Sequence, residues 1–440
     1  MRSLLLLISV CIPITATGWA PNDGDTVVFL GDSITHQSLY TQYVENFFIT
    51  RFPERNIAFH NAGVAGDTAA NALARFDEDV AAHRPTYVTV LFGMNDGKYE
   101  DFNAETFRSY QASMQSLLDR IEAIDAKAIV LSPTMFDHAV TEQRRDDATW
   151  RFQKKQHSVH YNSLMAFYGG WCAEEARLRG AEFIDLWAPL NSYTRKGRRG
   201  DPKFTLIGDA IHPQASGQVV MAFEILSQMG VDRPATNSIV ITKRGSKWTG
   251  NRGTVDVVGD KQGVIRFTNT AKAIPWVVPE KHATLPLRWQ LPADGRLGYE
   301  LVKAGHRLSA DRFKISGLPP GDYEILIDGN SIGTWNHIAL GTKIELQSNP
   351  LTPQYQQSLR VAELNRQRHD ETIRPARDKW GTIKGLRKRY ASDPAKLNVR
   401  LSETKEILAD LRTQSSKMLT KVREAAKPVA RQWTIRRKLP

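Results

Sequence analysis

The chain has 440 residues, of which 41% are hydrophobic and 24% charged, and these proportions exclude an intrinsically disordered or fibrous protein. A chain of this length has room for two or three domains, each with its own core. The net charge of +12 comes from residues 351–440, which hold 22 Lys and Arg against 9 Asp and Glu. The excess positive charge therefore belongs to this C-terminal segment and gives little information about a functional site elsewhere in the chain.

Residues 1–20 have the layout of a secretory signal peptide. Arg2 precedes the apolar run Leu4–Ile14, and small residues follow at Gly18 and Ala20, where we expect cleavage. The run is too short to span a bilayer, and no later stretch reaches the roughly 18 apolar residues of a spanning helix. We expect a secreted or periplasmic protein without a transmembrane segment. A lipid anchor at Cys11 is the less favoured alternative, because the residue before it is not small.

From about residue 22 to 232, apolar strands alternate with amphipathic helices. The expected strands are Thr26–Leu30, Asn56–His60, Tyr87–Phe92, Ala128–Leu131 and Glu182–Leu186. The expected helices lie near 37–50, 68–82, 104–125, 145–178 and 216–229. This order predicts one domain over residues 21–235, with a parallel sheet covered by helices on both faces.

Residues 236–350 have a different pattern, with short alternating runs separated by turn signals. The expected strands are Ser238–Thr242, Gly263–Phe267, Arg312–Ile315 and Tyr323–Ile327. They predict a smaller β-rich accessory domain, in the form of a sandwich.

Residues 351–440 read as a basic helical region, with expected helices over 357–373 and 397–427. The region could pack against the other domains, bind anionic cell-surface polymers or bind nucleic acid. Nucleic acid is the least expected partner for an exported protein, and basic residues on a helix usually form its solvated face.

Four short segments of the first domain carry groups that can do chemistry. Gly31-Asp32-Ser33 follows the first strand, Asn61–Thr68 follows the second and Gly93–Asp96 the third, while Asp209–Pro213 precedes the last helix. The carboxyl ends of parallel strands meet at one edge of a sheet, where ligands bind. Together the segments supply a hydroxyl nucleophile, an imidazole base, a carboxylate and donors for an oxyanion, as acyl transfer to water requires.

These segments resemble the four signature blocks of the SGNH (GDSL-type) hydrolases, over about half of the chain. The resemblance implies a flavodoxin-like three-layer α/β/α sandwich and a carboxylic ester hydrolase that needs no cofactor. It implies that Ser33 is the nucleophile, His212 the general base and Asp209 the carboxylate that orients it. The oxyanion hole would combine the backbone N–H groups of Ser33 and Gly66 with the side-chain amide of Asn95. No His/Cys/Asp cluster has the spacing of a metal site.

Each block alone has a structural alternative. An isolated Asp-x-x-His is more often a surface ion pair or a cap, the glycines of the second block could form a turn, and Asn95-Asp96 could cap a helix. Four coincidences in one domain are improbable, so the hydrolase interpretation is favoured. The competing class is a glycan-binding protein that kept the fold without activity.

The substrate is less closely indicated than the reaction, because the family hydrolyses lipid esters, thioesters and acetyl groups on sugars. Expected export and the accessory domain favour acetylated carbohydrate, the second only by association. The segment Asn61–Gly66 is also similar to that of pectin-directed acetylesterases in the family. A lysophospholipase or thioesterase acting on lipid acyl chains is the alternative.

The stretch Trp187–Phe204 is the candidate for substrate contact. It contains Trp187 and a basic run with Arg195 and Arg198 just before Asp209. We hypothesise that Trp187, Arg195 and Arg198, together with Asp32, contact the substrate, with the basic loop facing acidic sugars. A solvated surface loop is the alternative.

Overall fold

The structure is a computed structural model that describes residues 19–150, 152–153, 155–229, 237–251, 255–261, 263–279 and 295–438. All but the last two residues of the expected signal peptide lie outside the described residues.

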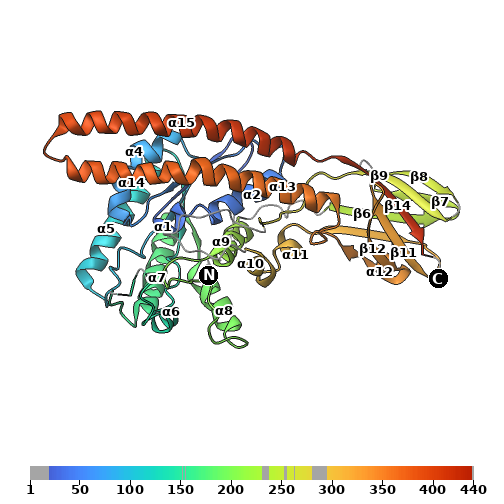
Figure 1. The fold of residues 1–440 in the computed structure, drawn as a ribbon, viewed down its shortest axis with the longest axis horizontal. Helices are drawn as coiled ribbons and strands as arrows, with labels where there is room; N and C mark the ends of the chain where they lie inside the picture. The colour runs from blue at the N-terminus through green and yellow to red at the C-terminus, as the bar shows by residue number, and fades with distance from the viewer. Residues whose placement is uncertain are drawn as a thin grey trace, which may run out of the picture.

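A five-stranded parallel sheet in the order β2-β1-β3-β4-β5 forms the centre of the first domain (Figure 1). Its strands are β1 (Thr26–Gly31), β2 (Ala58–Gly63), β3 (Tyr87–Leu91), β4 (Lys127–Leu131) and β5 (Glu182–Ile184). Gly31 pairs with Gly63 on one side and with Leu91 on the other, so the first three strands end at the same level. The loops that leave these ends therefore meet at one edge of the sheet.

Helices cover both faces of this sheet. They are α1 (Ser33–His36), α2 (Tyr40–Arg51), α3 (Ala69–Leu73), α4 (Phe76–Asp79), the 3₁₀ turn η1 (Ala81–His83), α5 (Ala104–Glu122), α6 (His138–Gln143), α7 (Tyr161–Arg179), α8 (Trp187–Gly197) and α9 (Ala215–Gln228). Val27 and Phe29 of β1 join a core with α2, α8 and α9, whereas Val28 and Leu30 join a second core with α3, α4, α5 and α7. A strand buried on both faces is typical of a parallel sheet. The predicted three-layer α/β/α fold is confirmed.

Two expected helices of this domain differ from the structure. The helix expected near 68–82 is divided into α3, α4 and η1. The helix expected near 145–178 begins only at Tyr161, and none of the described residues between 145 and 160 is helical. Asp147 accepts hydrogen bonds from Thr149 and from the Arg144 side chain, and such local contacts compete with helix formation.

The second lobe consists of two facing sheets, as the sequence predicts. One has the order β13-β10-β6-β7 and the other β12-β11-β14-β9-β8. Their strands are β6 (Asn237–Arg244), β7 (Lys247–Gly250), β8 (Val255–Lys261), β9 (Val264–Thr270), β10 (Asp311–Ser316), β11 (Asp322–Ile327), β12 (Asn330–Asn336), β13 (Ile344–Glu345) and β14 (Ala430–Arg437). Phe267, Phe313 and Trp433 stack between the sheets. The short helices α10 (Arg296–Leu301), α11 (Ala304–Leu308) and α12 (His337–Thr342) complete this part of the chain.

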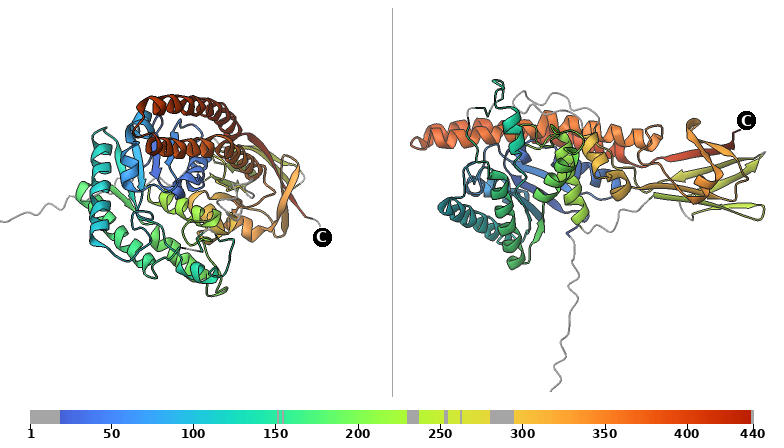
Figure 2. Two further views of the ribbon diagram at one scale, coloured as in Figure 1. Left: turned by 60° about the vertical axis from the view of Figure 1, so that its left-hand side comes forward. Right: turned by 90° about the horizontal axis from the view of Figure 1, so that it is seen from below.

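A helical arm over residues 353–426 crosses the first domain (Figures 1 and 2). It consists of α13 (Pro353–Arg368), the π-helical turn η3 (His369–Ile373), α14 (Arg374–Arg389) and α15 (Pro394–Ala426). The predicted helical character of the region is confirmed. The sequence did not indicate that the chain then returns through β14 to the middle of the five-stranded sheet of the second lobe.

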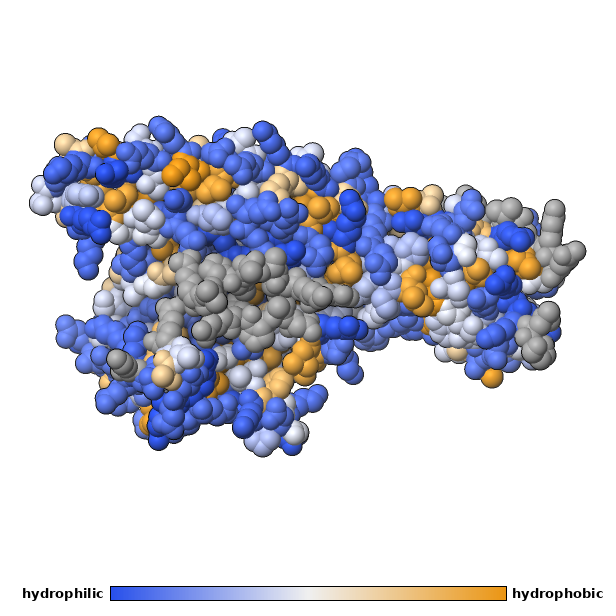
Figure 3. Space-filling model, viewed as in Figure 1, coloured by the Kyte–Doolittle hydropathy of each residue, from blue (hydrophilic) through white to orange (hydrophobic). Residues whose placement is uncertain are grey.

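The arm has a mainly hydrophilic outer face (Figure 3). None of the helices in the described ranges is both long and apolar enough to cross a bilayer.

Candidate active site

Ser33 is the first residue of α1 and lies two positions after the end of β1, with Asp32 between them. Asp32 caps this short helix, because its Oδ1 accepts a hydrogen bond of 2.8 Å from the N–H of Ile34. Ser33 is only 7% exposed. The sharp change from strand to helix thus presents the hydroxyl at the carboxyl edge of the sheet, as the sequence predicts.

The Ser33 hydroxyl lies at one end of a line of hydrogen bonds. Its Oγ is 2.8 Å from Nε2 of His212, and Nδ1 of His212 is 2.7 Å from Oδ2 of Asp209. Nδ1 donates to the carboxylate, so Nε2 is the nitrogen that accepts the hydroxyl proton. The structure therefore brings together the three predicted catalytic residues, which lie up to 179 positions apart in the chain.

The loop before α9 holds Asp209 and His212 in this arrangement. Oδ1 of Asp209 also accepts the backbone N–H groups of Ile211 and His212 at 3.0 and 2.7 Å. Burial raises the pKa of Asp209, but the charge of His212 and these hydrogen bonds outweigh it and hold the pKa below its ordinary value. Asp209 therefore stays ionised at neutral pH, as a partner that stabilises an imidazolium must.

The loop after β2 brings Gly66 to the same edge. Gly66 has a φ of +73°, a conformation that favours glycine, and it is exposed. Gly63 lies closer to α1, where an added Cβ would meet the backbone nitrogen of His36 at 2.3 Å. His36 in turn accepts the N–H of Ala65 on Nδ1 at 3.2 Å. Helix α1 and this loop are thus packed against each other, and the predicted oxyanion loop is held beside Ser33.

Asn95 completes the set of predicted oxyanion donors. Its Nδ2 donates to the backbone oxygen of Asp67 at 2.9 Å and, over a longer 3.3 Å, to Oδ2 of Asp32. Its Oδ1 accepts from the hydroxyl of Tyr99 at 3.0 Å. Tyr99 has a φ of +65°, an uncommon conformation for a tyrosine. The amide plane of Asn95 is therefore fixed from both ends, and Tyr99 is a positioning residue that the sequence did not indicate.

Two further carboxyl groups lie behind the site. Burial raises the pKa of Asp32 to about 7 and that of Asp96 to about 6. Asp96 accepts the backbone N–H groups of Ala69 and Gly93, both at 2.9 Å. Asp32 is 1% exposed, and its two oxygens accept from Ile34 and Asn95. Through these two hydrogen bonds Asp32 helps to position Ser33 and Asn95. The substrate contact expected of Asp32 remains a prediction.

A buried network of ion pairs joins the oxyanion loop to the helical arm. Arg75 pairs with Asp67 at 2.8 Å and with Asp79 at 2.5 Å. Arg377 of α14 pairs with Asp79 and donates from Nε to the backbone oxygen of Gly63 at 2.8 Å. Sequence motifs could not reveal this network, because its members belong to segments about 300 positions apart. The only signal was the concentration of basic residues in the arm.

The stretch predicted to contact substrate is a helix with a structural role. It forms α8, and Trp187 donates from Nε1 to the backbone and side-chain oxygens of Asn162 at 3.0 and 2.9 Å. Arg198 pairs at 2.7 Å with Asp137, whose N–H donates to the backbone oxygen of Ala210 at 2.9 Å. Arg198 therefore supports the loop with Asp209 and His212, although the sequence suggested a substrate contact. Arg195 is exposed and remains a candidate for that contact.

Within the described parts of the chain, no group of three or more His, Cys, Asp and Glu side chains is placed to hold a metal ion. The one cysteine among them, Cys172, is buried and lies 3.0 Å from the hydroxyl of Tyr110. Burial raises its pKa to about 12, so it stays a thiol at neutral pH.

Comparison with known proteins identifies a matching family and similar chains. Residues 29–220 match the GDSL-like lipase/acylhydrolase family. An acetylxylan esterase from Geobacillus stearothermophilus is 24% identical over 230 residues, which cover 48% of this chain and 95% of that protein. A solved structure described as a gut microbial diltiazem-metabolizing enzyme is 25% identical and superposes with a TM-score of 0.80, covering 96% of this chain and 99% of that one. This superposition includes the second lobe and the helical arm.

Proposed function

Because residues 29–220 belong to the GDSL-like lipase/acylhydrolase family and the protein is a carboxylic ester hydrolase, we propose that it removes acetyl groups from carbohydrate by a serine mechanism. The observation that carries this proposal is the line of hydrogen bonds from Ser33 through His212 to Asp209. Each atom in it has the role that acyl transfer to water requires.

In the first half of the reaction, Oγ of Ser33 attacks the ester carbonyl while Nε2 of His212 takes its proton. Asp209 stabilises the imidazolium that results. His212 then gives the proton to the departing sugar hydroxyl, which leaves an acetyl group on Ser33. In the second half, water attacks this acyl-enzyme with His212 again as the base, and acetate leaves as Ser33 regains its proton.

The negative charge that develops on the carbonyl oxygen is met by three donors. They are the backbone N–H groups of Ser33 and Gly66 and the Nδ2 of Asn95. The 2.9 Å bond from Asn95 to the backbone of Asp67 fixes the amide, whereas the 3.3 Å contact with Asp32 is weak enough to be exchanged for the oxyanion.

Acetylated carbohydrate is favoured over a lipid ester by similarity. The acetylxylan esterase that matches this chain aligns over 95% of its own length, so the likeness covers the whole of that enzyme. The second lobe has the kind of two-sheet architecture that accompanies many carbohydrate-active enzymes, which is an argument by association. Arg195, exposed on α8, is the remaining candidate for a contact with acidic sugars.

The decisive experiment measures acetate release from acetylated xylan, acetylated pectin and a neutral acetylated glucan. It is run beside p-nitrophenyl esters of increasing chain length and beside diltiazem. We expect release from at least one polysaccharide, a fall in rate with acyl length and no activity in Ser33→Ala. Rates that rise with acyl length would favour the lysophospholipase or thioesterase alternative. Failure of a fluorophosphonate probe to label Ser33 would favour an inactive glycan-binding protein.

We also propose that the protein is exported by the signal peptide of residues 1–20. Trp19 is 4% exposed and packs 5.6 Å from the ring of Tyr87, so cleavage after Gly18 would keep this contact and cleavage after Ala20 would lose it. Mass spectrometry of the protein recovered from the medium or periplasm reads the new N-terminus directly. A full-length protein retained in the cytoplasm would contradict export.

The basic residues that remain exposed on the arm are proposed to hold the exported enzyme near an anionic glycan. Lys388, Arg389 and Lys417 are exposed. Such binding weakens steeply with salt. Replacing these three with Gln should weaken retention on a polyuronate column at low salt, and unchanged retention would contradict the proposal.

A further inference from the structure

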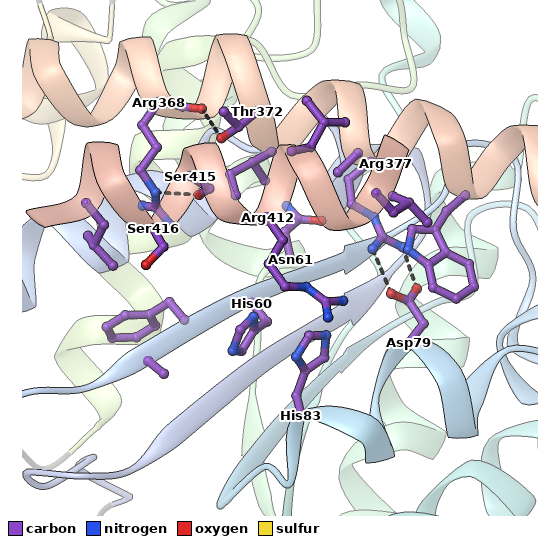
Figure 4. A pocket seen from close by; sticks show the side chains of 18 residues that line it. His60, Asn61, Asp79, His83, Arg368, Thr372, Arg377, Arg412, Ser415 and Ser416 are labelled. Atoms are coloured by element: carbon purple, nitrogen blue, oxygen red, sulfur yellow. Dashed lines mark hydrogen bonds and ion pairs between the residues drawn. The ribbon is translucent and has the colours of Figure 1, made fainter. Parts of the chain in front are cut away.

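A pocket of about 310 Å³ lies between the edge strand β2 and the helical arm (Figure 4). Neither Ser33 nor His212 lines it. Its size is at the lower end of the range for small-molecule sites. The proposed esterase chemistry gives this pocket no role.

Three titratable side chains that line this pocket have no hydrogen-bond or ion-pair partner among the described residues. The rings of His60, on β2, and His83, on η1, stack with centroids 3.9 Å apart. No ring nitrogen of either makes a hydrogen bond within the described ranges, and Arg412 of α15 forms no ion pair there. Figure 4 shows Arg412 reaching from the arm toward the two imidazole rings. The guanidinium offers several N–H donors, and each neutral imidazole adds one N–H donor and one acceptor nitrogen.

The other charges around the pocket are already matched. Arg368 pairs with Glu45 at 2.8 Å and donates to Ser415 at 2.9 Å. Arg377 pairs with Asp79. Only Arg412 therefore keeps an uncompensated charge among the arginines that line the pocket, which makes the pocket attractive to an anion.

Burial is the main reason why the two histidines are neutral. Burial, followed by neighbouring groups that include Arg412, lowers the pKa of His60 to about 3 and that of His83 to about 4. Both rings are therefore neutral at pH 7, when the pocket is empty. An anion placed beside them would favour their protonated forms, so that its binding takes up protons.

The rest of the wall is apolar. Trp380 and Ile373 come from the middle of the arm, and Leu408, Leu411 and Leu419 come from α15. Burial of such side chains against a ligand is favourable in proportion to the apolar area removed from water. An inorganic ion would leave this surface unused.

We propose that this pocket binds a small organic carboxylate. The carboxylate pairs with Arg412 and accepts hydrogen bonds from His60 and His83, and its apolar body packs against Trp380 and Leu408. The pairing is of the charge-assisted kind, which is stronger than a hydrogen bond between neutral groups. Asn61, which also lines the pocket, donates at 2.6 Å to the backbone oxygen of Thr35, two positions after Ser33. A ligand bound in this pocket is therefore positioned to influence the loop that holds the proposed oxyanion donors.

The affinity should depend on pH through the imidazoles. The titratable and charged groups that face the pocket are His60 from β2, His83 from η1, Asp79 from α4, Arg368 and Arg377 from the first two helices of the arm, and Arg412 from α15. Asp79, Arg368 and Arg377 are held in ion pairs. The two histidines gain protons when the anion binds, so the carboxylate should bind more tightly at the lower pH.

The test is isothermal titration of the full chain with benzoate and, separately, with inorganic phosphate at pH 5.5 and 7.5. Ser33→Ala is the background, so that hydrolysis plays no part. We expect benzoate to bind more tightly at pH 5.5, with proton uptake seen in buffers of different ionisation enthalpy. Arg412→Met, which keeps an unbranched apolar stem and removes the guanidinium, should weaken binding about tenfold or more. Lys421→Met, at an exposed position of the same helix that does not line the pocket, should not weaken it.

Unchanged binding in Arg412→Met, or no binding of benzoate at either pH, would overturn the proposal. Phosphate binding as tightly as benzoate would overturn the assignment to an organic anion. His83→Phe preserves the stacked ring and removes its nitrogens, so it should weaken binding and reduce proton uptake. Proton uptake equal to that of the parent would contradict the role given to the histidines.

Discussion

Lys384, on α14 of the helical arm, lies 2.7 Å from Oδ1 of Asp67, directly after Gly66 in the chain. Its Nζ also donates to the backbone oxygen of Gly66 at 3.3 Å and to the Asn71 side chain at 3.1 Å. The arm therefore holds the residue proposed to supply an oxyanion N–H, from 318 positions away in the sequence.

This contact predicts that Lys384→Met lowers kcat with little change in KM. The oxyanion forms only along the reaction path, so a misplaced donor costs transition-state stabilisation and leaves ground-state binding intact. We expect a loss of about tenfold in kcat on p-nitrophenyl acetate, since small displacements of catalytic groups are costly. Lys384→Arg should restore part of the rate. The matched control is Lys388→Met, which removes an exposed charge from the same helix, and an equal loss in that variant would refute the contact as the cause.

The hydrogen-bonded line from Ser33 to Asp209 predicts non-additive losses. Ser33→Ala and His212→Ala should each reduce kcat to a similar residual level, and the double variant should lose little more. Asp209→Asn should cost about 10³–10⁴ in kcat, because the amide favours the wrong tautomer of His212. Single-turnover kinetics on p-nitrophenyl acetate measure all of these variants. A double variant much slower than either single one would show that the residues act independently.

The hydrogen bonds of Asn95 predict a second pattern of losses in kcat. Asn95→Ala removes one oxyanion donor and should lower kcat by about 10²–10³. Tyr99→Phe removes only the hydroxyl that donates to Oδ1 of Asn95, so its loss should be smaller and confined to kcat. Thermal unfolding of both variants serves as the control for folding. A Tyr99→Phe enzyme with raised KM and normal kcat would instead place Tyr99 in substrate binding.

The sequence was sufficient for the strands and the motifs because both depend on local signals. Hydrophobic runs marked all five strands of the parallel sheet, and the turn after each of the first three carried a recognisable block. The helix expected near 145–178 was placed too early because the polar turn around Asp147 interrupts it. Apolar residues such as Trp150 and Phe152 continue the pattern through this turn, but they contribute to the core from a loop.

Local sequence signals could not have predicted where the helical arm packs. Its basic residues resemble the solvated face of an ordinary helix, and only the fold shows that Arg377 and Lys384 end on acidic partners of the first domain. The contacts that connect it to the site join residues more than 300 positions apart, and no local pattern encodes them. For the same reason the sequence suggests a substrate contact for Arg198 and gives no sign of its ion pair with Asp137, which lies 61 positions earlier.

The buried imidazole of His60 predicts how stability changes with pH. Burial lowers its pKa to about 3 from an ordinary value of 6.5, so between these values the unfolded chain binds a proton that the folded chain does not. Stability that His60 contributes above pH 6.5 is therefore lost as the pH falls. His60→Phe keeps the ring and cannot take up the proton. Urea unfolding at pH 7.5 and 5 should show the parent losing about 2 kcal/mol more than the variant.

The raised pKa values of Asp32 and Asp96 act in the opposite direction. Their folded forms hold a proton that the unfolded chain releases, so they stabilise the fold at low pH and lose this effect as the pH rises toward 7. Both groups are present in the parent and in His60→Phe, and their contribution cancels in the comparison. If His60→Phe loses as much stability as the parent between pH 7.5 and pH 5, then His60 is protonated normally in the folded chain.

Arg195 and Arg198 lie three positions apart, yet the structure predicts different results for their removal. Arg198→Ala leaves Asp137, which is 2% exposed, without its ion pair, and breaking such a pair costs about 3–5 kcal/mol. Because Asp137 holds the backbone of Ala210, we expect lower stability and lower kcat on every ester, p-nitrophenyl acetate included. Arg195→Ala should leave stability and that small ester unchanged and raise KM only for uronate-containing acetylated glycans. Steady-state kinetics on acetylated pectin and a neutral acetylated glucan separate the two effects. An Arg195→Ala enzyme with parental KM on both polymers would remove the basic face of α8 from substrate recognition.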